Sequence, residues 1–192
     1  MTNHGIVLAS TSPRRRELMK KIGVDFISVS PENDNEKLNE ERSFEDQIME
    51  LAYKKAISVK KKHPQKLILG ADTLVVIGEK VLGKPVNASE ARDMLKELSG
   101  KQHQVITGCA IIYMDEIIKF YRITKVNFNE LTDAEITYYI RSKEPFNKAG
   151  AYAIQGIGSN FIDSIQGDYY SVMGLPISMI YKRLKKFGFI NL

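Results

Sequence analysis

The sequence predicts an α/β fold with a mixed central sheet, flanking helices and two lobes around a cleft. Short apolar runs that are typical of strands alternate with amphipathic helical patterns along the chain. Two long β-rich runs, "HQVITGCAIIYMD" and "EIIKFYRITKVNFNEL", follow one another and indicate an antiparallel pair that turns near Asp115. With 192 residues, we expect one α/β domain over 1–192 with two lobes, and a ligand in the cleft between them.

Two strands and a helix are predicted near the N-terminus. The apolar runs over 5–9 and 26–30 indicate short strands. Between them, Ser12 suits an N-cap, Pro13 suits the first helical position and Gly23 suits the stop. These signals predict a helix that begins with three arginines.

A long helix and a hairpin follow a polar, acidic loop. Ser43 opens "SFED", a capping box, and apolar residues at helical spacing continue to about Lys62. The apolar run over 66–78 indicates a buried strand that ends at "GADT", followed by a hairpin through Gly78 into "KVLGKP". A further helix is predicted over 87–98, capped by its asparagine.

The last third of the chain contains helices and shorter strands. "TDAEITYYIRS", over 132–142, is another capping-box helix, which we expect to form the second lobe together with the hairpins. Short strands are expected around Tyr152 and Phe161, and a final helix over 176–187.

Composition and charge narrow the class of protein. A net charge of +5 and a pI near 9.1 leave room for an acidic partner, but the basic runs lack interleaved aromatics, which argues against nucleic acid. No apolar run approaches the roughly 18 residues that cross a bilayer. The N-terminus lacks a signal-peptide pattern, so we expect a cytoplasmic protein. The single cysteine, Cys109, excludes an internal disulfide and is interpreted as a small core residue rather than a nucleophile.

Three arginines, Arg14, Arg15 and Arg16, lie at the electropositive end of the first predicted helix. Cations there cost about 0.3–1 kcal/mol each unless an anion is present. Either the arginines extend into water, or the free N–H groups and an arginine fork hold a phosphate. Around an ideal helix Arg15 and Arg16 point about 100° and 200° away from Arg14, so we expect at least one to be plain surface.

Carboxylates and a lysine supply the candidate chemistry. Asp72 follows a buried strand, at the edge of the sheet where α/β folds bind ligands, although such an aspartate can also be a turn former. Lys84, in "LGKP", is either a phosphate ligand or a solvent-facing loop residue. The acidic loop adds Glu32, Asp34 and Glu36. One of these beside Asp72 would suit Mg²⁺ or Mn²⁺, which binds few carboxylates and keeps waters for phosphate substrates.

Other catalytic classes find little support in the sequence. The three histidines have neither a nucleophile context nor a zinc spacing, and there is no Walker sequence or dinucleotide fingerprint. The remaining candidate groups are cations, which could bind phosphates, and carboxylates, which could bind a metal or accept a proton. These groups favour metal-assisted attack of water on a phosphoryl group.

An ordered set of motifs carries a resemblance to a known family. "LASTSPRRREL", "LAYKKA", "GADT", "LGKP", "SGKQHQVITG", "KEPFNKAGAYAIQGIG" and "GDYYSVMGLP" together closely resemble the Maf family, once described as septum-formation inhibitors. The match runs from about residue 6 to residue 180. The resemblance implies a fold similar to inosine triphosphate pyrophosphatases and hydrolysis of a nucleoside triphosphate to the monophosphate and diphosphate.

The resemblance also implies roles for particular residues. The family's general base resembles Asp72, its specificity positions resemble Arg14, Thr73 and Gln155, and its phosphate-side cations resemble Lys55 and Lys84. Glutamine at position 155, where the 7-methyl-GTP branch has a glutamate, resembles the dTTP and UTP branch. Glu36 is the best match for the family's metal-binding glutamate, after a short insertion, and would bind the metal together with Asp72.

These inferences predict a dTTP and UTP pyrophosphatase. Its triphosphate lies near the turn from Ser10 to Arg14, and water attacks the α-phosphorus with help from Asp72 and a divalent metal. Alternatives are a pyrophosphatase for another modified nucleotide, and a non-catalytic regulator of cell division that binds nucleotide or nucleic acid. A homodimer is compatible with the implied fold, although the sequence shows no self-complementary patch.

Overall fold

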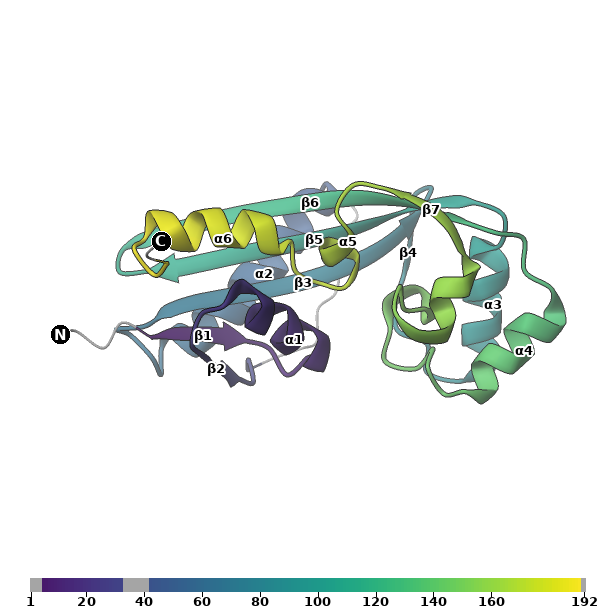
Figure 1. Ribbon diagram of the computed structural model, residues 1–192, viewed down its shortest axis with the longest axis horizontal. Helices are drawn as coiled ribbons and strands as arrows, with labels where there is room; N and C mark the ends of the chain where they lie inside the picture. Colours follow the sequence, from purple (N-terminus) through teal and green to yellow (C-terminus); the bar gives the residue numbers. More distant parts are fainter. Residues whose placement is uncertain (1–4, 33–41, 191–192) are drawn as a thin grey trace. The chain divides into compact units, whose positions relative to one another are not determined.

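The computed structural model describes residues 5–32 and 42–190 (Figure 1). The chain divides into two compact units. Unit 1 consists of Met1–Asp72, Thr107–Arg122 and Gly174–Leu192, and unit 2 consists of Thr73–Ile106 and Ile123–Met173. The boundaries between the units fall inside three long strands, β3 (Leu67–Ile77), β5 (Gln102–Tyr113) and β6 (Glu116–Phe128).

The sheet is mixed, as the sequence predicts. Its strands follow the order β2-β1-β3-β5-β6-β7, and β4 pairs with β3 outside this path. The short strands β1 (Ile6–Ala9) and β2 (Phe26–Val29) are parallel to each other, and β1 is parallel to the first residues of β3. The partners β4 (Lys80–Leu82) and β7 (Ile162–Gln166) are antiparallel to β3 and β6.

Unit 1 packs helices against the parallel strands. Its helices are α1 (Pro13–Ile22), α2 (Phe44–Lys60) and α6 (Ile177–Lys186), and α1 contacts α6. One core cluster joins β1, α2, β3 and β5 through small and β-branched residues, namely Val7, Ala9, Ala52, Ala56, Val59, Ile68, Ala110 and Ile112.

Two strand glycines let α2 approach the sheet closely. A Cβ added at Gly70 would overlap the carbonyl oxygen of Ala52 and lie 2.9 Å from the amide nitrogen of Ala56. A Cβ added at Gly108 would lie 2.5 Å from the carbonyl oxygen of Ile48. The backbone of α2 therefore lies directly on β3 and β5.

Unit 2 surrounds an aromatic core. It contains α3 (Ala88–Leu98), α4 (Asp133–Arg141), the short α5 (Tyr169–Val172) and the 3₁₀ turns η1 (Ala149–Ala151) and η2 (Gly156–Phe161). Helices α3 and α4 lie side by side (Figure 1). Rings stacked edge to face fill the space between these helices and the strands: His103, Phe128, Tyr139, Tyr152 and Phe161.

The predicted helix starts are confirmed by the capping contacts. The Ser12, Ser43 and Asn87 side chains each accept a hydrogen bond from a backbone N–H in the first turn of α1, α2 and α3. Thr132 and Glu135 form the predicted reciprocal capping box of α4. No helix of the described residues is long and apolar enough to span a membrane.

The structure corrects two predicted strands. Asp72 does not follow a strand end, because β3 continues to Ile77; it lies two residues beyond Gly70, which pairs with Ala9, the last residue of β1. The carboxylate thus lies at the carboxyl edge of the parallel strands, although its own strand runs on.

The predicted strand around Tyr152 is absent, because the backbone N–H of Ala153 bonds to a tyrosine hydroxyl instead of a neighbouring strand. The strand expected around Phe161 is β7, which begins at the next residue.

Candidate active site

Serine hydroxyls brace the turn from β1 into α1. The buried Ser10 hydroxyl accepts a hydrogen bond from the Ser12 N–H at 3.1 Å, and the backbone carbonyl of Ser10 accepts one from the Ser28 hydroxyl at 2.6 Å. Ser12 caps α1, whose first turn contains no acidic residue. These bonds fix the path of the turn, and the electropositive end of α1 begins beside the end of β1.

The three arginines differ in their surroundings. Arg16 is exposed, which confirms that at least one of them is plain surface, and Arg14 is half-buried. The Arg15 side chain is only 12% exposed. Its Nε donates a hydrogen bond to the carbonyl oxygen of Gly174 at 2.9 Å, and one terminal nitrogen lies 3.9 Å from Oδ1 of Asp72.

Arg15 is not among the site residues predicted from the sequence, because the family resemblance points to Arg14. A signal for Arg15 does exist. It lies three and four residues before Leu18 and Met19, both fully buried, so the helical period places it on the inward face of α1.

Lys55 and Asp72 form a close charge pair. The Lys55 Nζ lies 3.1 Å from Oδ2 of Asp72, and the two side chains are 11% and 20% exposed. Lys55 lies on α2 next to Ala56, which touches Gly70, and Gly70 and Asp72 point to the same side of β3. The close helix contact thus brings the ammonium group to the carboxylate.

Three further predicted site residues, Thr73, Lys84 and Gln155, lie in unit 2. Thr73, half-buried, follows Asp72 in β3 and begins unit 2. Lys84 is exposed in the loop after β4, where the carbonyl of Gly83 accepts a hydrogen bond from Gly150 at 3.0 Å. Gln155 is half-buried and directly precedes η2.

The acidic loop is described only in part. Glu36 and Asp34 lie outside the described residues. Glu32 pairs with Lys62, 2.6 Å away on the surface, and this partner lowers the pKa of the Glu32 carboxyl. In this structure Glu32 is therefore part of a surface ion pair with Lys62.

A divalent metal is compatible with Asp72 as a ligand. Within residues 5–32 and 42–190, no group of three or more His, Cys, Asp or Glu side chains gathers as a closed metal cage. Mg²⁺ does not need one, because it keeps several waters and uses one or two carboxylates together with substrate phosphates. A partly exposed carboxylate such as Asp72 suits this mode of binding.

Cys109 and His103 are structural residues. Burial raises the pKa of the Cys109 thiol to about 12, so it remains protonated and is a poor nucleophile, as predicted. His103 is buried in the aromatic core of unit 2, and its Nε2 lies 2.7 Å from the Tyr152 hydroxyl.

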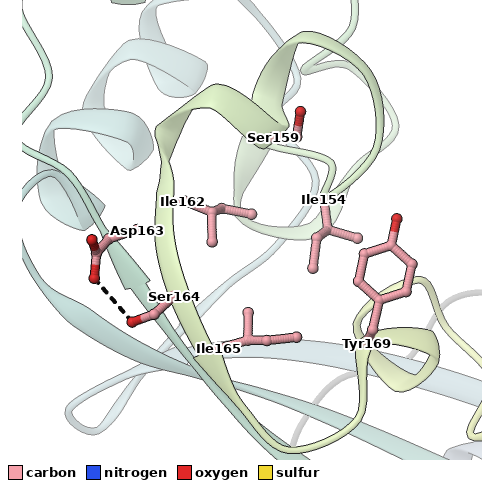
Figure 2. Close-up of a pocket in the computed structure, with 7 residues that line it drawn as sticks. All are labelled: Ile154, Ser159, Ile162, Asp163, Ser164, Ile165 and Tyr169. Atoms are coloured by element: carbon pink, nitrogen blue, oxygen red, sulfur yellow. Dashed lines mark hydrogen bonds between the residues drawn. The ribbon is translucent and has the colours of Figure 1, made fainter.

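A shallow pocket of about 280 Å³ lies in unit 2. Figure 2 shows the side chains of Ile154, Ile162 and Ile165 around it, with the Tyr169 ring on one side. Its walls contain none of the predicted catalytic residues, but Ile154 immediately precedes Gln155.

Comparison with known proteins identifies the family. The model of the Maf-like protein family matches residues 5–187. A Bacillus cereus protein named dTTP/UTP pyrophosphatase is 51% identical over 183 residues, covering 95% of this chain and 90% of that protein. A Bacillus anthracis protein of the same name is 50% identical and covers 95% of each chain.

A solved structure shares the fold. The Staphylococcus aureus Ham1 protein is 15% identical, with a TM-score of 0.57 over 95% of this chain and 99% of that one. This likeness confirms the predicted fold class. The family match over residues 5–187, together with relatives about half identical over 95% of the chain, shows that the chain belongs to the Maf-like protein family.

Proposed function

We propose that this protein hydrolyses dTTP and UTP to the nucleoside monophosphate and diphosphate. The observation that carries the proposal is the position of Asp72, held by Lys55 and Arg15 at the carboxyl edge of the parallel strands. Family membership, and the name dTTP/UTP pyrophosphatase that relatives about half identical to this chain carry, support the reaction and its substrates.

Asp72 is the proposed general base. The Lys55 ammonium and the Arg15 guanidinium fix the direction of its carboxylate, at 3.1 and 3.9 Å. In the reaction, a water oxygen bonds to the α-phosphorus while the bond from that phosphorus to the α–β bridging oxygen breaks. The carboxylate accepts the water proton, and diphosphate leaves.

The start of α1 is the proposed phosphate site. The helix dipole favours an anion at this end of α1. The N–H groups of the first turn, the turn that begins at Ser10 and the Arg14 side chain add donors and positive charge there. We assign Lys55 and, in unit 2, Lys84 to further neutralisation of the triphosphate. This role accounts for cations at the end of a helix where acids are normally preferred.

A divalent metal, Mg²⁺ or Mn²⁺, is part of the proposal. Asp72 would hold it, together with Glu36 from the part of the acidic loop outside the described residues. When bound, it would supply charge neutralisation for the phosphates.

Gln155 and Thr73 are the proposed base-selecting residues. An amide donates to a carbonyl and accepts from an N–H, which are the two groups at the edge of uracil and thymine. A carboxylate at the same place would suit a cationic, donor-rich purine instead.

Diphosphate release tests the proposal. The substrates are dTTP, UTP, CTP, GTP, 7-methyl-GTP and ITP, each with Mg²⁺, Mn²⁺ or chelator, using wild type, Asp72→Asn and the control Asp93→Asn, an exposed aspartate on α3. We expect metal-dependent release from dTTP and UTP that is lost in Asp72→Asn and kept in the control. Binding without release from any nucleotide would favour the regulator over the enzyme.

A further inference from the structure

Three hydrogen-bond donors surround the carboxylate of Glu144 in unit 2. Its Oε2 accepts from the backbone N–H of Ile157 at 3.0 Å, and its Oε1 accepts from that of Gly158, also at 3.0 Å. Oε1 also accepts from the hydroxyl of Tyr139 at 3.0 Å. Gln155, the residue before η2, does not cap that turn with its own side chain. Glu144 therefore caps η2 from the turns that follow α4, through charge-assisted bonds that are stronger than neutral ones.

A second anchor holds the other end of the same segment. The hydroxyl of Tyr139 accepts a hydrogen bond from the backbone N–H of Ala153 at 3.2 Å. Tyr139 is fully buried, with its ring edge to face against Phe161. Gln155 therefore lies between two points of attachment, and Tyr139 and Glu144 are themselves joined by a hydrogen bond.

Gly156 makes room for this arrangement. Its φ of +75° is a conformation that favours glycine, and an added Cβ would lie 2.5 Å from Oε2 of Glu144. The backbone of the segment is thus shaped around the carboxylate. A solvated surface glutamate would not require this fit.

The anchored segment also forms one wall of the pocket in unit 2. Ile154 and Ser159, which both line the pocket, lie on either side of Gln155 and the two bound N–H groups (Figure 2). Movement of the segment would therefore change both the pocket wall and the position of the amide.

We infer that Glu144 is a positioning residue for nucleobase selection. The inference rests on the proposed function, in which Gln155 reads the base. An amide offers one kind of donor and one kind of acceptor, and several nucleobases have an edge that can form a hydrogen bond with each. Selection for uracil and thymine then depends on where the amide is held, which Glu144 and Tyr139 determine through the backbone.

The test compares two isosteric changes, Glu144→Gln and Glu135→Gln. Glutamine at position 144 retains one acceptor oxygen but turns an NH₂ group toward N–H or O–H donors. Glu135→Gln is the matched control, since Glu135 also caps a helical turn of unit 2, at the start of α4, and its carboxylate bonds there to Thr132. The kcat and KM for dTTP, UTP, CTP and ITP are measured, with equilibrium binding of dTTP and CTP and amide hydrogen exchange over 153–158.

We expect Glu144→Gln to lower the ratio of kcat/KM for dTTP to that for CTP on the order of tenfold, through KM more than kcat. Amide exchange over 153–158 should become faster. Tyr139→Phe should likewise lower the dTTP-to-CTP ratio of kcat/KM and speed up this exchange. Glu135→Gln should leave the ratio and the exchange unchanged.

Several outcomes separate this inference from the proposed function. If wild type hydrolyses dTTP but Glu144→Gln keeps the wild-type ratio, the positioning role is wrong while the enzyme remains. Equal losses in the two glutamate variants would indicate a general stability effect and would also overturn it. If wild type hydrolyses neither dTTP nor UTP, the proposed function fails, and the relative binding of dTTP and CTP decides the role of Glu144.

Discussion

The Lys55 ammonium nitrogen lies 3.1 Å from Oδ2 of Asp72, although the two residues lie on different elements, α2 and β3. This pair exists because Gly70 lacks a side chain. At Gly70 the helix backbone meets the strand directly, and the next residue on the same side of the strand is Asp72. The position of the proposed base is therefore a consequence of how the core of unit 1 packs.

Gly70→Ala should damage both stability and activity. The new methyl group would overlap the Ala52 carbonyl, so α2 must shift, at a cost of roughly 1–3 kcal/mol in the free energy of unfolding. Lys55 would move with the helix, and kcat should fall. Urea denaturation and diphosphate release measure the two effects. Gly83→Ala is the control, because an added Cβ there meets no atom within 4 Å; a similar loss in this variant would contradict the packing argument.

Lys55→Met should lower kcat for dTTP by roughly 100-fold, because the base loses a cation that lies 3.1 Å away and the phosphates lose one counter-charge. Lys54→Met changes the exposed neighbour on α2 and should leave kcat within a factor of about two. Steady-state diphosphate release by the two variants provides the comparison. Equal kcat values would show that Lys55 is only a structural partner of the carboxylate.

Arg15→Gln should reduce kcat more than Arg16→Gln does. Arg15 joins the Gly174 carbonyl to Asp72, and its loss frees the carboxylate to rotate, with an expected cost on the order of 100-fold. Arg16 is exposed, so its variant should behave like wild type. Kinetics with dTTP distinguish the two, and a larger effect at Arg16 would refute the assignment of Arg15 to the site.

Local signals predicted most helix boundaries correctly. Ser12, Asn87 and Thr132 act as caps because each side chain accepts from an N–H only three residues ahead, which a short stretch of sequence determines. Gly23 ends α1 with a φ of 81°, a conformation that favours glycine.

Long-range contacts could not be predicted in the same way. The carbonyl that Arg15 binds lies on Gly174, 159 residues later. The location of Asp72 depends on the register in which Gly70 pairs with Ala9, and no pattern within β3 contains that register. Glu144 could not be predicted as a functional residue either, because the N–H groups of Ile157 and Gly158 reach its carboxylate only in the folded segment 153–158.

His103 provides a test of stability that is independent of catalysis. It is 2% exposed, its Nδ1 has no hydrogen-bond partner among the described residues, and burial lowers its pKa from 6.5 to about 4. The folded protein thus holds this imidazole neutral at a pH where the unfolded chain would protonate it. Between these two pKa values the unfolded state binds more protons, so stability falls as the pH falls.

The expected loss from His103 alone is roughly 3 kcal/mol in the free energy of unfolding between pH 6.5 and pH 4, with little contribution above pH 6.5. Urea denaturation at intervals across this range measures it. His103→Leu removes the titrating ring and should flatten this part of the profile, while lowering stability at pH 7.5 through the lost contact with the Tyr152 hydroxyl. His63→Leu, which changes a half-buried histidine after α2, is the control and should retain the wild-type slope. If His103→Leu loses stability with acid as steeply as wild type does, other groups cause the acid sensitivity, and the buried neutral imidazole is not its source.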